Sequence, residues 1–491
     1  MKKWIDPVVP VLIISILAIG CSPKVMPPAP YGALPGKRQL EWHKMETYAF
    51  LHFTVNTFTG KEWGYGDEKE DVFNPTDFDA DQIIGTLAKA GFKGAIITAK
   101  HHDGFCLWPS AYTNHSVKNS SWKNGKGDVV RELSRACKKY GIKFGVYLSP
   151  WDRNHADYGT TQYITYYRNQ LKELLTQYGA IFEVWLDGAN GGDGYYGGAK
   201  EKRFIDRSHY YDWEETFKLV RRLQPNAIMF SDAGPDIRWV GNEHGHAKDS
   251  CWATYTPLPA KGFTKAYAGT CQYWLGETGT RNGQYWMPAE TDVSIRPGWF
   301  FHPAEDSKVK SLSQLMDIYF HSVGNGTSLN LNIPPDRTGK IHTTDSLRLM
   351  EFRNYLDRAF SKNLLRGCKA WASDTRGRAY KPGRLTDNNP ETYWAAKDGT
   401  QGAIVEFELN GTKTINCLVL QEYIALGQRI SGFTVEYLAD GQWKQAARGS
   451  TIGYKKIVRF APCSTGKIRL RLEAMASPLL SEAAAYEIPE I

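Results

Sequence analysis

Three segments of the chain repeat one pattern, in which an amphipathic helix ends at a glycine and a run of β-branched and aromatic residues follows at once. The glycines and their runs are Gly91 before FKGAIITAK, Gly141 before IKFGVYLSP, and Gly179 before AIFEVWLDG. Glycine at a helix C-terminus adopts the left-handed conformation without steric cost, which ends the helix. Helices that alternate in this way with apolar strands predict βα units and a parallel sheet.

The βα units are expected to continue over about residues 38–350. Further strands are predicted at 47–53, 227–230 and 328–333, and two more are expected between 251 and 301, where Gly, Pro and Trp are dense. Long insertions at one rim are typical of a barrel active site. We therefore predict an α/β domain with a (β/α)8-like TIM barrel. A doubly wound open sheet is the alternative, although no Gly-x-Gly-x-x-Gly motif follows any of these strands.

Polar side chains stand where the predicted strands end. The first of the three repeated strands ends at His101 and His102, the second at Asp152, and the third at Asp187. Ligands of parallel βα sheets bind beyond the carboxyl ends of the strands. These positions therefore mark a candidate site.

The pattern changes near residue 365. From there to the C-terminus the chain consists of short β segments without helical periodicity, namely AIVEFEL, NCLVLQEY, GFTVEYL, KIVRFA and KIRLRLE. Short strands at this spacing predict an all-β sandwich domain over residues 368–491. Residues 351–367 are expected to form a linker between this domain and the barrel.

The first 20 residues have the features of an export signal. Two lysines precede an apolar stretch at 8–19 that is too short to span a bilayer. The segment resembles a bacterial lipoprotein signal peptide (residues 1–20), whose cleavage leaves Cys21 to be acylated; an ordinary secretory signal is the alternative. A Pro-rich tether follows at 21–37. The expected location is the bacterial cell envelope, with a lipid anchor at the periplasmic face of the outer membrane.

Composition excludes some partners and favours another. The formal charge of +8 includes no dense run of Lys or Arg, so binding to nucleic acid is not expected. Aromatic residues make up 13% of the chain and include 16 Trp, whose indole rings suit the C–H faces of sugars. Apart from Cys21, seven of the eight cysteines remain, at irregular spacing. Neither a disulfide framework nor a CxxC metal site is expected from them.

Several motifs at the strand ends and in the loops after them carry a family resemblance. They are His52, Glu62-Trp63-Gly64, His101-His102-Asp103-Gly104, VWLDG (184–188), RWVGNE (238–243) and ETDVSIRPGWF (290–300). Together they resemble glycoside hydrolase family 29, the α-L-fucosidases, over about residues 38–350. The SPWDRN, RWVGNE and ETDVSIRPGW segments are similar to the subgroup that acts on α1,3- and α1,4-linked fucose in Lewis-type glycans.

The resemblance implies a retaining exo-α-L-fucosidase that acts by double displacement on fucosylated oligosaccharides or glycoconjugates. Retention requires an ionised carboxylate as nucleophile and a protonated carboxylic acid about 5–5.5 Å away. Asp187 is the implied nucleophile and Glu243, in the GNEHG loop, is the implied acid/base. Glu290 is the rival acid, and Glu243 is otherwise a rim carboxylate bonded to Trp239 or His244. No cofactor is expected for catalysis.

Neutral and aromatic side chains are expected to bind the sugar. Fucose presents ring hydroxyls and one methyl group, so its pocket needs converging polar groups and an apolar wall. Arg296 either contacts the sugar or a carboxylate, or forms a structural ion pair. The candidate substrate-binding residues are His52, Glu62, Trp63, His101, His102, Tyr147, Trp185, Arg296 and Trp299.

The C-terminal domain has a resemblance of its own. The LTDNNPETYWA segment is similar to the opening loop of discoidin-like domains, which include family 32 carbohydrate-binding modules. The resemblance implies a sandwich of jelly-roll type. Such modules commonly hold a structural Ca²⁺ in this loop, and oxygen ligands suit that ion. The ligands that the resemblance implies are Asp387, Asn389, Thr392 and Glu487. An unmetallated capped turn is the alternative.

Two other function classes stay open. A barrel metallohydrolase would take its metal ligands from His101, His102, Asp187, His244 and His246. Such barrels usually begin with His-x-His after the first strand, where this chain offers His52 alone. The second class is a non-catalytic glycan-binding lipoprotein, which an assay of substrate turnover would distinguish.

Overall fold

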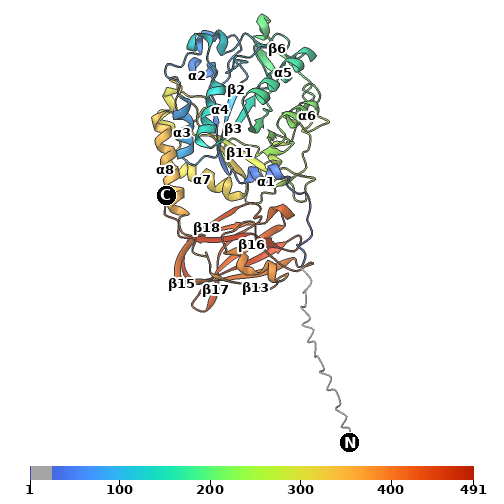
Figure 1. Ribbon diagram of the computed structural model, residues 1–491, viewed down its shortest axis with the longest axis vertical. Helices are drawn as coiled ribbons and strands as arrows, with labels where there is room; N and C mark the ends of the chain where they lie inside the picture. Colours follow the sequence, from blue (N-terminus) through green and yellow to red (C-terminus); the bar gives the residue numbers. More distant parts are fainter. Residues whose placement is uncertain (2–24) are drawn as a thin grey trace.

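The computed structural model describes Met1 and residues 25–491. The expected signal peptide, apart from Met1, and the acylation site Cys21 lie outside the described residues. Of the helices in the described part, none is both long and apolar enough to cross a membrane. Figure 1 shows a helix-rich barrel at one end of the molecule and a sheet domain packed against it.

Eight parallel strands close into a barrel, which confirms the predicted TIM barrel. They are β1 (Thr47–Leu51), β2 (Gly94–Lys100), β3 (Lys143–Leu148), β4 (Ile181–Trp185), β7 (Ile228–Ser231), β8 (Ile237–Trp239), β11 (Ala289–Ser294) and β12 (Ser328–Asn332). Neighbouring strands follow the order β1-β12-β11-β8-β7-β4-β3-β2, and β1 also pairs with β2. Every residue of β2 and β12 is buried, as expected for a parallel sheet covered by helices.

Helices cover the outside of the barrel (Figure 1). They are α3 (Ala80–Lys89), α4 (Val129–Tyr140), α5 (Thr161–Gln177), α6 (Trp213–Leu223), α7 (Leu312–His321) and α8 (Thr343–Ala359). Helix α1 (Lys37–His43) lies at the end of the barrel next to the sheet domain, and α2 (Val55–Thr59) lies at the opposite end. Gly91, Gly141 and Gly179 follow α3, α4 and α5 with φ angles of +83°, +71° and +84°. The predicted helix stops are therefore confirmed.

The sixth barrel strand lies outside its expected window. It is β8, at Ile237–Trp239, whereas the prediction placed the sixth and seventh strands between 251 and 301. The strand has three residues, and a short turn alone separates it from β7. Because the strand is so short and no helix precedes it, the hydrophobic pattern did not predict a strand here. The other strand of that window, β11, lies inside it.

The predicted linker at 351–367 and the described part of the predicted tether at 21–37 have more defined structure than expected. The barrel does not end at residue 350, because α8 continues unbroken to Ala359 with its apolar face packed on the barrel. The first half of the linker expected at 351–367 is thus helix. The described part of the tether also lies on the sheet domain, since the backbone N–H of Tyr31 donates to the carbonyl of Leu426 at 3.0 Å.

The C-terminal domain is built from antiparallel strands, in agreement with the predicted discoidin-like sandwich. Its strands are β13 (Lys369–Ala372), β14 (Trp394–Ala395), β15 (Gly402–Gln421), β16 (Ile430–Ala439), β17 (Gln442–Gly449), β18 (Lys456–Ala474), β19 (Leu479–Leu480) and β20 (Glu482–Tyr486). Predicted segments merge in pairs: AIVEFEL joins NCLVLQ in β15, and KIVRFA joins KIRLRLE in β18. Register shifts interrupt the pairing of these two strands, so each long strand reads as two short ones.

Four short strands lie in the long loops of the barrel, and the loop after β8 contacts the sheet domain. The short strands are β5 (Gly192–Gly194), β6 (Glu201–Arg203), β9 (Thr254–Tyr255) and β10 (Tyr285–Trp286). The Lys456 ammonium forms an ion pair with Asp249 at 2.6 Å, and the backbone N–H of Cys251 donates to Thr451 Oγ1 at 2.9 Å. The sheet domain therefore supports a loop that begins at the barrel rim.

Candidate active site

Two adjoining hollows open at the ends of the barrel strands. The inner hollow holds about 130 Å³ and the outer one about 490 Å³. The residues that line both are Trp63, Trp185, Asp187, Ala189, Glu243 and Asp292. Both of the carboxylates expected to act in catalysis therefore lie where the two hollows meet.

Asp187 lies two residues beyond the end of β4. Its Oδ2 accepts a hydrogen bond from the Tyr147 hydroxyl at 2.9 Å, and its Oδ1 accepts one from the backbone N–H of Ala189 at 2.6 Å. Burial raises the pKa of Asp187, while the two hydrogen bonds oppose that shift. The carboxylate is thus held in one orientation and is poorly hydrated, as a nucleophile should be.

Glu243 lies in the loop after β8 and is more exposed than Asp187. Its Oε2 accepts a hydrogen bond from the Trp299 indole at 3.4 Å. The Trp239 indole, one of its expected partners, donates instead to Asp292 at 2.5 Å. Partial burial and the negative charge of Asp187 raise the pKa of Glu243. A glutamic acid with a raised pKa keeps its proton to higher pH, which suits a general acid.

Glu290, the rival acid, lies inside the barrel and lines neither hollow. Its Oε1 accepts hydrogen bonds from the Trp185 indole at 2.8 Å and from the Asn330 amide at 3.1 Å, and its Oε2 accepts one from the Tyr48 hydroxyl. Glu183 of β4 lies beside Glu290 inside the barrel, and burial together with the charge of Glu290 raises the pKa of Glu183 well above its ordinary value. Glu290 thus holds Trp185 in place and has no direct access to a ligand in either hollow.

Three histidines line the inner hollow: His52, His101 and His102. His52 Nδ1 lies 2.9 Å from Asn332 Oδ1, and His102 Nδ1 lies 2.7 Å from Ser149 Oγ. Burial lowers the pKa of both His52 and His102 to about 3, so these rings are neutral at physiological pH. Neutral imidazoles both donate and accept hydrogen bonds, which suits the recognition of sugar hydroxyls.

Aromatic rings form the apolar part of the same wall. Trp63, Trp185 and Trp299 all line the inner hollow. Trp185 stacks on Phe230 with ring centroids 4.3 Å apart, and Glu62 accepts a hydrogen bond from the backbone N–H of Trp299 at 2.8 Å. The Trp185 ring is therefore fixed by Phe230 and the Trp299 backbone by Glu62, whereas Trp63 is 53% exposed.

Two residues expected to bind substrate line neither hollow. Arg296 is buried and forms ion pairs with Asp345 and Asp306, both at 2.8 Å. Of its two predicted roles, the structural ion pair is the one that the geometry supports. Tyr147 contacts the site through its hydrogen bond to Asp187 and through edge-on ring contacts with His101 and Trp185.

Two further carboxylates of the site were not predicted. Asp232 follows β7 and lines the outer hollow, where it accepts a hydrogen bond from the backbone N–H of Gly269 at 2.7 Å. Burial raises its pKa to about 7, and the charge of Asp187 adds to the shift. Burial, with the charges of Glu290 and Glu243, raises the pKa of Asp292 well above its ordinary value. Asp232 stands at a strand end, like Asp187, and that rule could have found it.

The ligands suggested for a barrel metallohydrolase are not brought together. His101, His102 and Asp187 line the inner hollow, but His244 and His246 line neither hollow. His246 instead contacts Asp317 of α7.

A further carboxylate, Glu482, lies beside the loop that was predicted to hold calcium. The Thr392 hydroxyl donates to Asp387 Oδ2 at 2.8 Å. Glu487 is exposed just beyond the end of β20, and its role as a calcium ligand stays a prediction. Glu482 Oε1 is buried without a hydrogen-bond partner. Burial and the charge of Asp387 raise the pKa of Glu482 to about 7.

Comparison with known families identifies both domains. The alpha-L-fucosidase family model matches residues 30–359, which is most of the chain. The chain belongs to the alpha-L-fucosidase family. In this fucosidase, the F5/8 type C domain model matches residues 369–482, which agrees with the discoidin-like prediction. The protein is therefore a glycoside hydrolase, and the metallohydrolase and non-catalytic alternatives are set aside.

Relatives of this fucosidase share both domains. Alpha-L-fucosidase 1 of Arabidopsis thaliana is 42% identical over 94% of this chain and 88% of its own length. A glycoside hydrolase 29 family member from an unknown rumen bacterium is 42% identical with a TM-score of 0.82, over 94% of this chain and 78% of that one. A Ruminococcus gnavus GH29 fucosidase in complex with fucose is 33% identical with a TM-score of 0.85, over 95% of this chain and 97% of that one.

Proposed function

We propose that this fucosidase is a retaining exo-enzyme, with Asp187 as nucleophile and Glu243 as acid/base. The supporting observation is that both carboxylates line both hollows, so that each faces their junction. A terminal fucose in the inner hollow would place its glycosidic bond at this junction, and the remainder of the glycan would occupy the outer hollow. The small volume of the inner hollow agrees with binding of a single terminal sugar.

The proposed reaction has two displacements at the anomeric carbon. Asp187 attacks that carbon while Glu243 gives its proton to the departing glycosidic oxygen, which leaves a covalent fucosyl-enzyme. Glu243 then accepts a proton from water, and the water oxygen displaces Asp187 to release fucose with its original configuration. Tyr147 and the backbone N–H of Ala189 stabilise the ionised Asp187 before attack and after its release.

We further propose that α1,3- and α1,4-linked fucose in Lewis-type glycans is the preferred substrate. A branched aglycone needs room, and the outer hollow provides about 490 Å³ with polar groups of Asn190 and Arg207 and the ring of Trp151 on its wall. We expect Lewis trisaccharides to be hydrolysed faster than an α1,2-linked fucoside. Rates on these glycans and on an aryl fucoside, measured side by side, test the linkage preference. Faster hydrolysis of the α1,2-fucoside would contradict it.

We propose a structural Ca²⁺ in the C-terminal domain, held by Asp387, Asn389, Thr392 and Glu482. The buried, unpartnered Glu482 oxygen beside Asp387 supports this assignment, because a hard cation would satisfy it and would relieve the repulsion between the two carboxylates. We expect chelation to lower the melting temperature of the wild-type chain and added Ca²⁺ to restore it. A Glu482→Gln variant whose melting temperature still responds fully to Ca²⁺ would contradict this ligand set, and Glu487→Gln is the matched control.

We also propose that the chain is a lipoprotein acylated at Cys21 and anchored at the periplasmic face of the outer membrane. The order of lysines, short apolar stretch and cysteine in the sequence supports the anchor. Mass spectrometry of the mature N-terminus, with the Cys21→Ala variant as control, tests it. The C-terminal domain would brace the barrel, since it holds the loop at Asp249 and Cys251, and its carbohydrate-binding role stays a proposal.

A further inference from the structure

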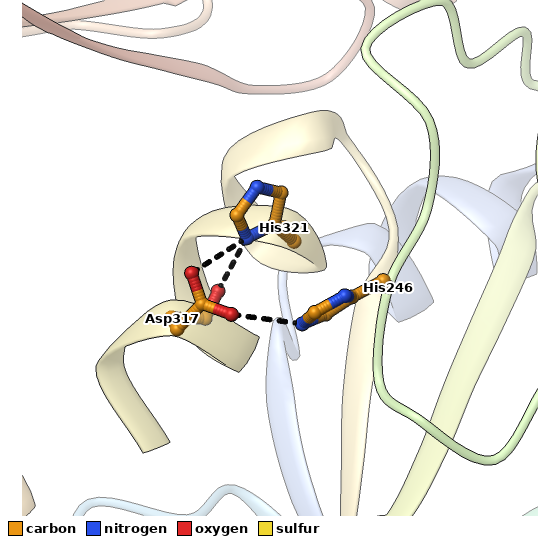
Figure 2. Close-up of side chains that lie close together, drawn as sticks. All are labelled: His246, Asp317 and His321. Carbon is orange, nitrogen blue, oxygen red and sulfur yellow. Dashed lines mark hydrogen bonds and ion pairs between the residues drawn. The ribbon is translucent and has the colours of Figure 1, made fainter. Parts of the chain in front are cut away.

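A cluster of metal-ligating side chains lies on the loop that carries Glu243, outside both hollows. His246 of that loop faces Asp317 and His321, which lie on one side of helix α7 (Figure 2). Their potential ligand atoms all lie within 4.8 Å of one another, the one such group of three found in the described part of the chain. Each side chain is a little under half exposed, so a dissolved ion can reach them.

The spacing of these atoms fits a tetrahedral metal ion. His246 Nε2 lies 3.0 Å from Asp317 Oδ2, and His321 Nδ1 lies 3.1 Å from Asp317 Oδ1. Two ligands bonded to one tetrahedral Zn²⁺ at about 2.0–2.2 Å would be separated by about 3.3–3.5 Å. Asp317 and His321 are four residues apart, which puts both on the same face of the helix. His321 Nδ1 also lies 2.9 Å from the backbone carbonyl oxygen of Asp317. Rotation of the His321 ring away from that carbonyl, with small rotations of Asp317 and His246, would bring all three side chains onto one ion.

The ligand types select the class of ion. Two imidazoles and one carboxylate suit Zn²⁺ and its neighbours in the transition series, whereas Ca²⁺ and Mg²⁺ prefer oxygen ligands alone. Three protein ligands leave a fourth position for water.

The cluster is mechanically connected to the proposed acid. His246 comes three residues after Glu243, and between them Gly245, at φ +84°, packs close to α7: a Cβ there would lie 2.9 Å from Ile318. The backbone N–H of Ala247 also donates to the carbonyl of His321 at 2.9 Å. The loop is thus already seated on α7, and an ion shared by the two elements would hold it there.

We propose that His246, Asp317 and His321 form a binding site for a zinc-class divalent ion, and that the bound ion fixes the Glu243 loop against helix α7. The first half of the proposal concerns binding alone. The second half rests on the proposed role of Glu243 as acid/base. A fixed loop would hold the acid in its productive position, so the ion would speed the hydrolysis of substrates that need a proton on the leaving group.

Metal binding is tested first, without any activity assay. Tag-free full-length protein is stripped with chelator, saturated with Ca²⁺ to occupy any oxygen site, and titrated with Zn²⁺ by calorimetry and with Co²⁺ by visible absorption. We expect one equivalent of ion and a tetrahedral Co²⁺ spectrum in the wild type, and loss of both in His246→Gln and His321→Gln. His209→Gln is the matched control, because His209 pairs with Asp206 at 2.8 Å on the surface without a third ligand. Failure of the wild type to bind, or equal binding by all variants, would overturn the site.

Coupling to the acid is tested next. In the wild type and in His209→Gln, we expect Zn²⁺ to raise the turnover of a Lewis trisaccharide by about fivefold or more, with little change on an activated aryl fucoside. His321→Gln should lose this response. Zn²⁺ binding with no effect on either substrate would overturn the coupling but not the site. Asp187→Ala is expected to lose all activity and still bind Zn²⁺. Activity that persisted in this variant would contradict the proposed function and would leave the metal site standing.

Discussion

Replacement of Asp187 by alanine is expected to lower kcat by about 10⁴-fold or more on every fucoside, because the anomeric carbon loses the group that attacks it. The protein should stay folded. Burial raises the pKa of Asp187, so its ionised form destabilises the native state above the unfolded pKa, and removing the carboxylate relieves that cost at neutral pH. Steady-state rates, the melting temperature and fucose binding by calorimetry check the three parts of this result.

Chemical rescue makes the same variant a test of mechanism. In Asp187→Ala, a small anion such as azide can enter the space that the carboxylate leaves and attack the anomeric carbon of an aryl fucoside. Attack from the face that Asp187 normally occupies gives β-fucosyl azide, whose configuration is read by proton NMR. Asp193→Asn is the control, since Asp193 is exposed and pairs with Arg153. Near wild-type hydrolysis by Asp187→Ala, or an azide product of α configuration, would contradict the assignment of the nucleophile.

The regular part of the fold was open to prediction because local signals agreed with one another. Each of Gly91, Gly141 and Gly179 closes an amphipathic helix just before an apolar strand, so periodicity, turn chemistry and strand composition all indicate the same βα unit. Where one of these signals was missing, the prediction failed. Strand β8 has three residues and no helix before it, and its place follows from the closure of the barrel.

The sequence predicted where the site lies, at the ends of the barrel strands, better than it predicted which side chains contact one another. The rule that polar residues at strand ends converge found Asp187, His101 and His102, which line one hollow. It failed for Asp152, which is buried in an ion pair with Lys100 at 3.0 Å and lines neither hollow. Sequence position could not tell that Arg296 faces Asp345, because a motif gives the order of residues and not their directions.

The sequence also could not decide which of the two candidate acids, Glu290 or Glu243, faces the substrate. Glu290 and Glu243 are both glutamates that follow or lie in barrel strands, and both belong to motifs of the family. The difference between them is the environment: Glu290 accepts hydrogen bonds from buried groups inside the barrel, whereas Glu243 lines both hollows and accepts a hydrogen bond from the Trp299 indole. Only packing decides which of them can reach a glycosidic oxygen.

Replacement of Glu243 by glutamine is expected to slow the hydrolysis of substrates with poor leaving groups far more than that of substrates with good ones. Hydrolysis of Lewis-type glycans should fall by about 10²–10⁴-fold, the usual contribution of a general acid, because an alkoxide leaves poorly without a proton. An activated aryl fucoside needs no such proton, so its first displacement should stay fast. The second displacement lacks its general base and should become limiting, which gives a burst of released phenol in stopped-flow measurements.

The pH dependence of the same variant gives an independent check. The wild-type rate should fall at low pH as Asp187 gains a proton and at high pH as Glu243 loses one. Because burial and the charge of Asp187 raise the pKa of Glu243, the alkaline limb should lie above the range of an ordinary glutamic acid. In Glu243→Gln this limb should disappear from the kcat/KM profile, while the acid limb of Asp187 stays.

Glu290→Gln separates the two candidate acids. Since Glu290 holds the Trp185 indole inside the barrel, its replacement should lower the melting temperature and should slow Lewis-type glycans and aryl fucosides by similar factors. The burst and the loss of the alkaline limb should belong to Glu243→Gln alone. If Glu290→Gln instead produced the burst and spared the aryl fucoside, the proton donor would be Glu290, and the site at the junction of the two hollows would need a different assignment.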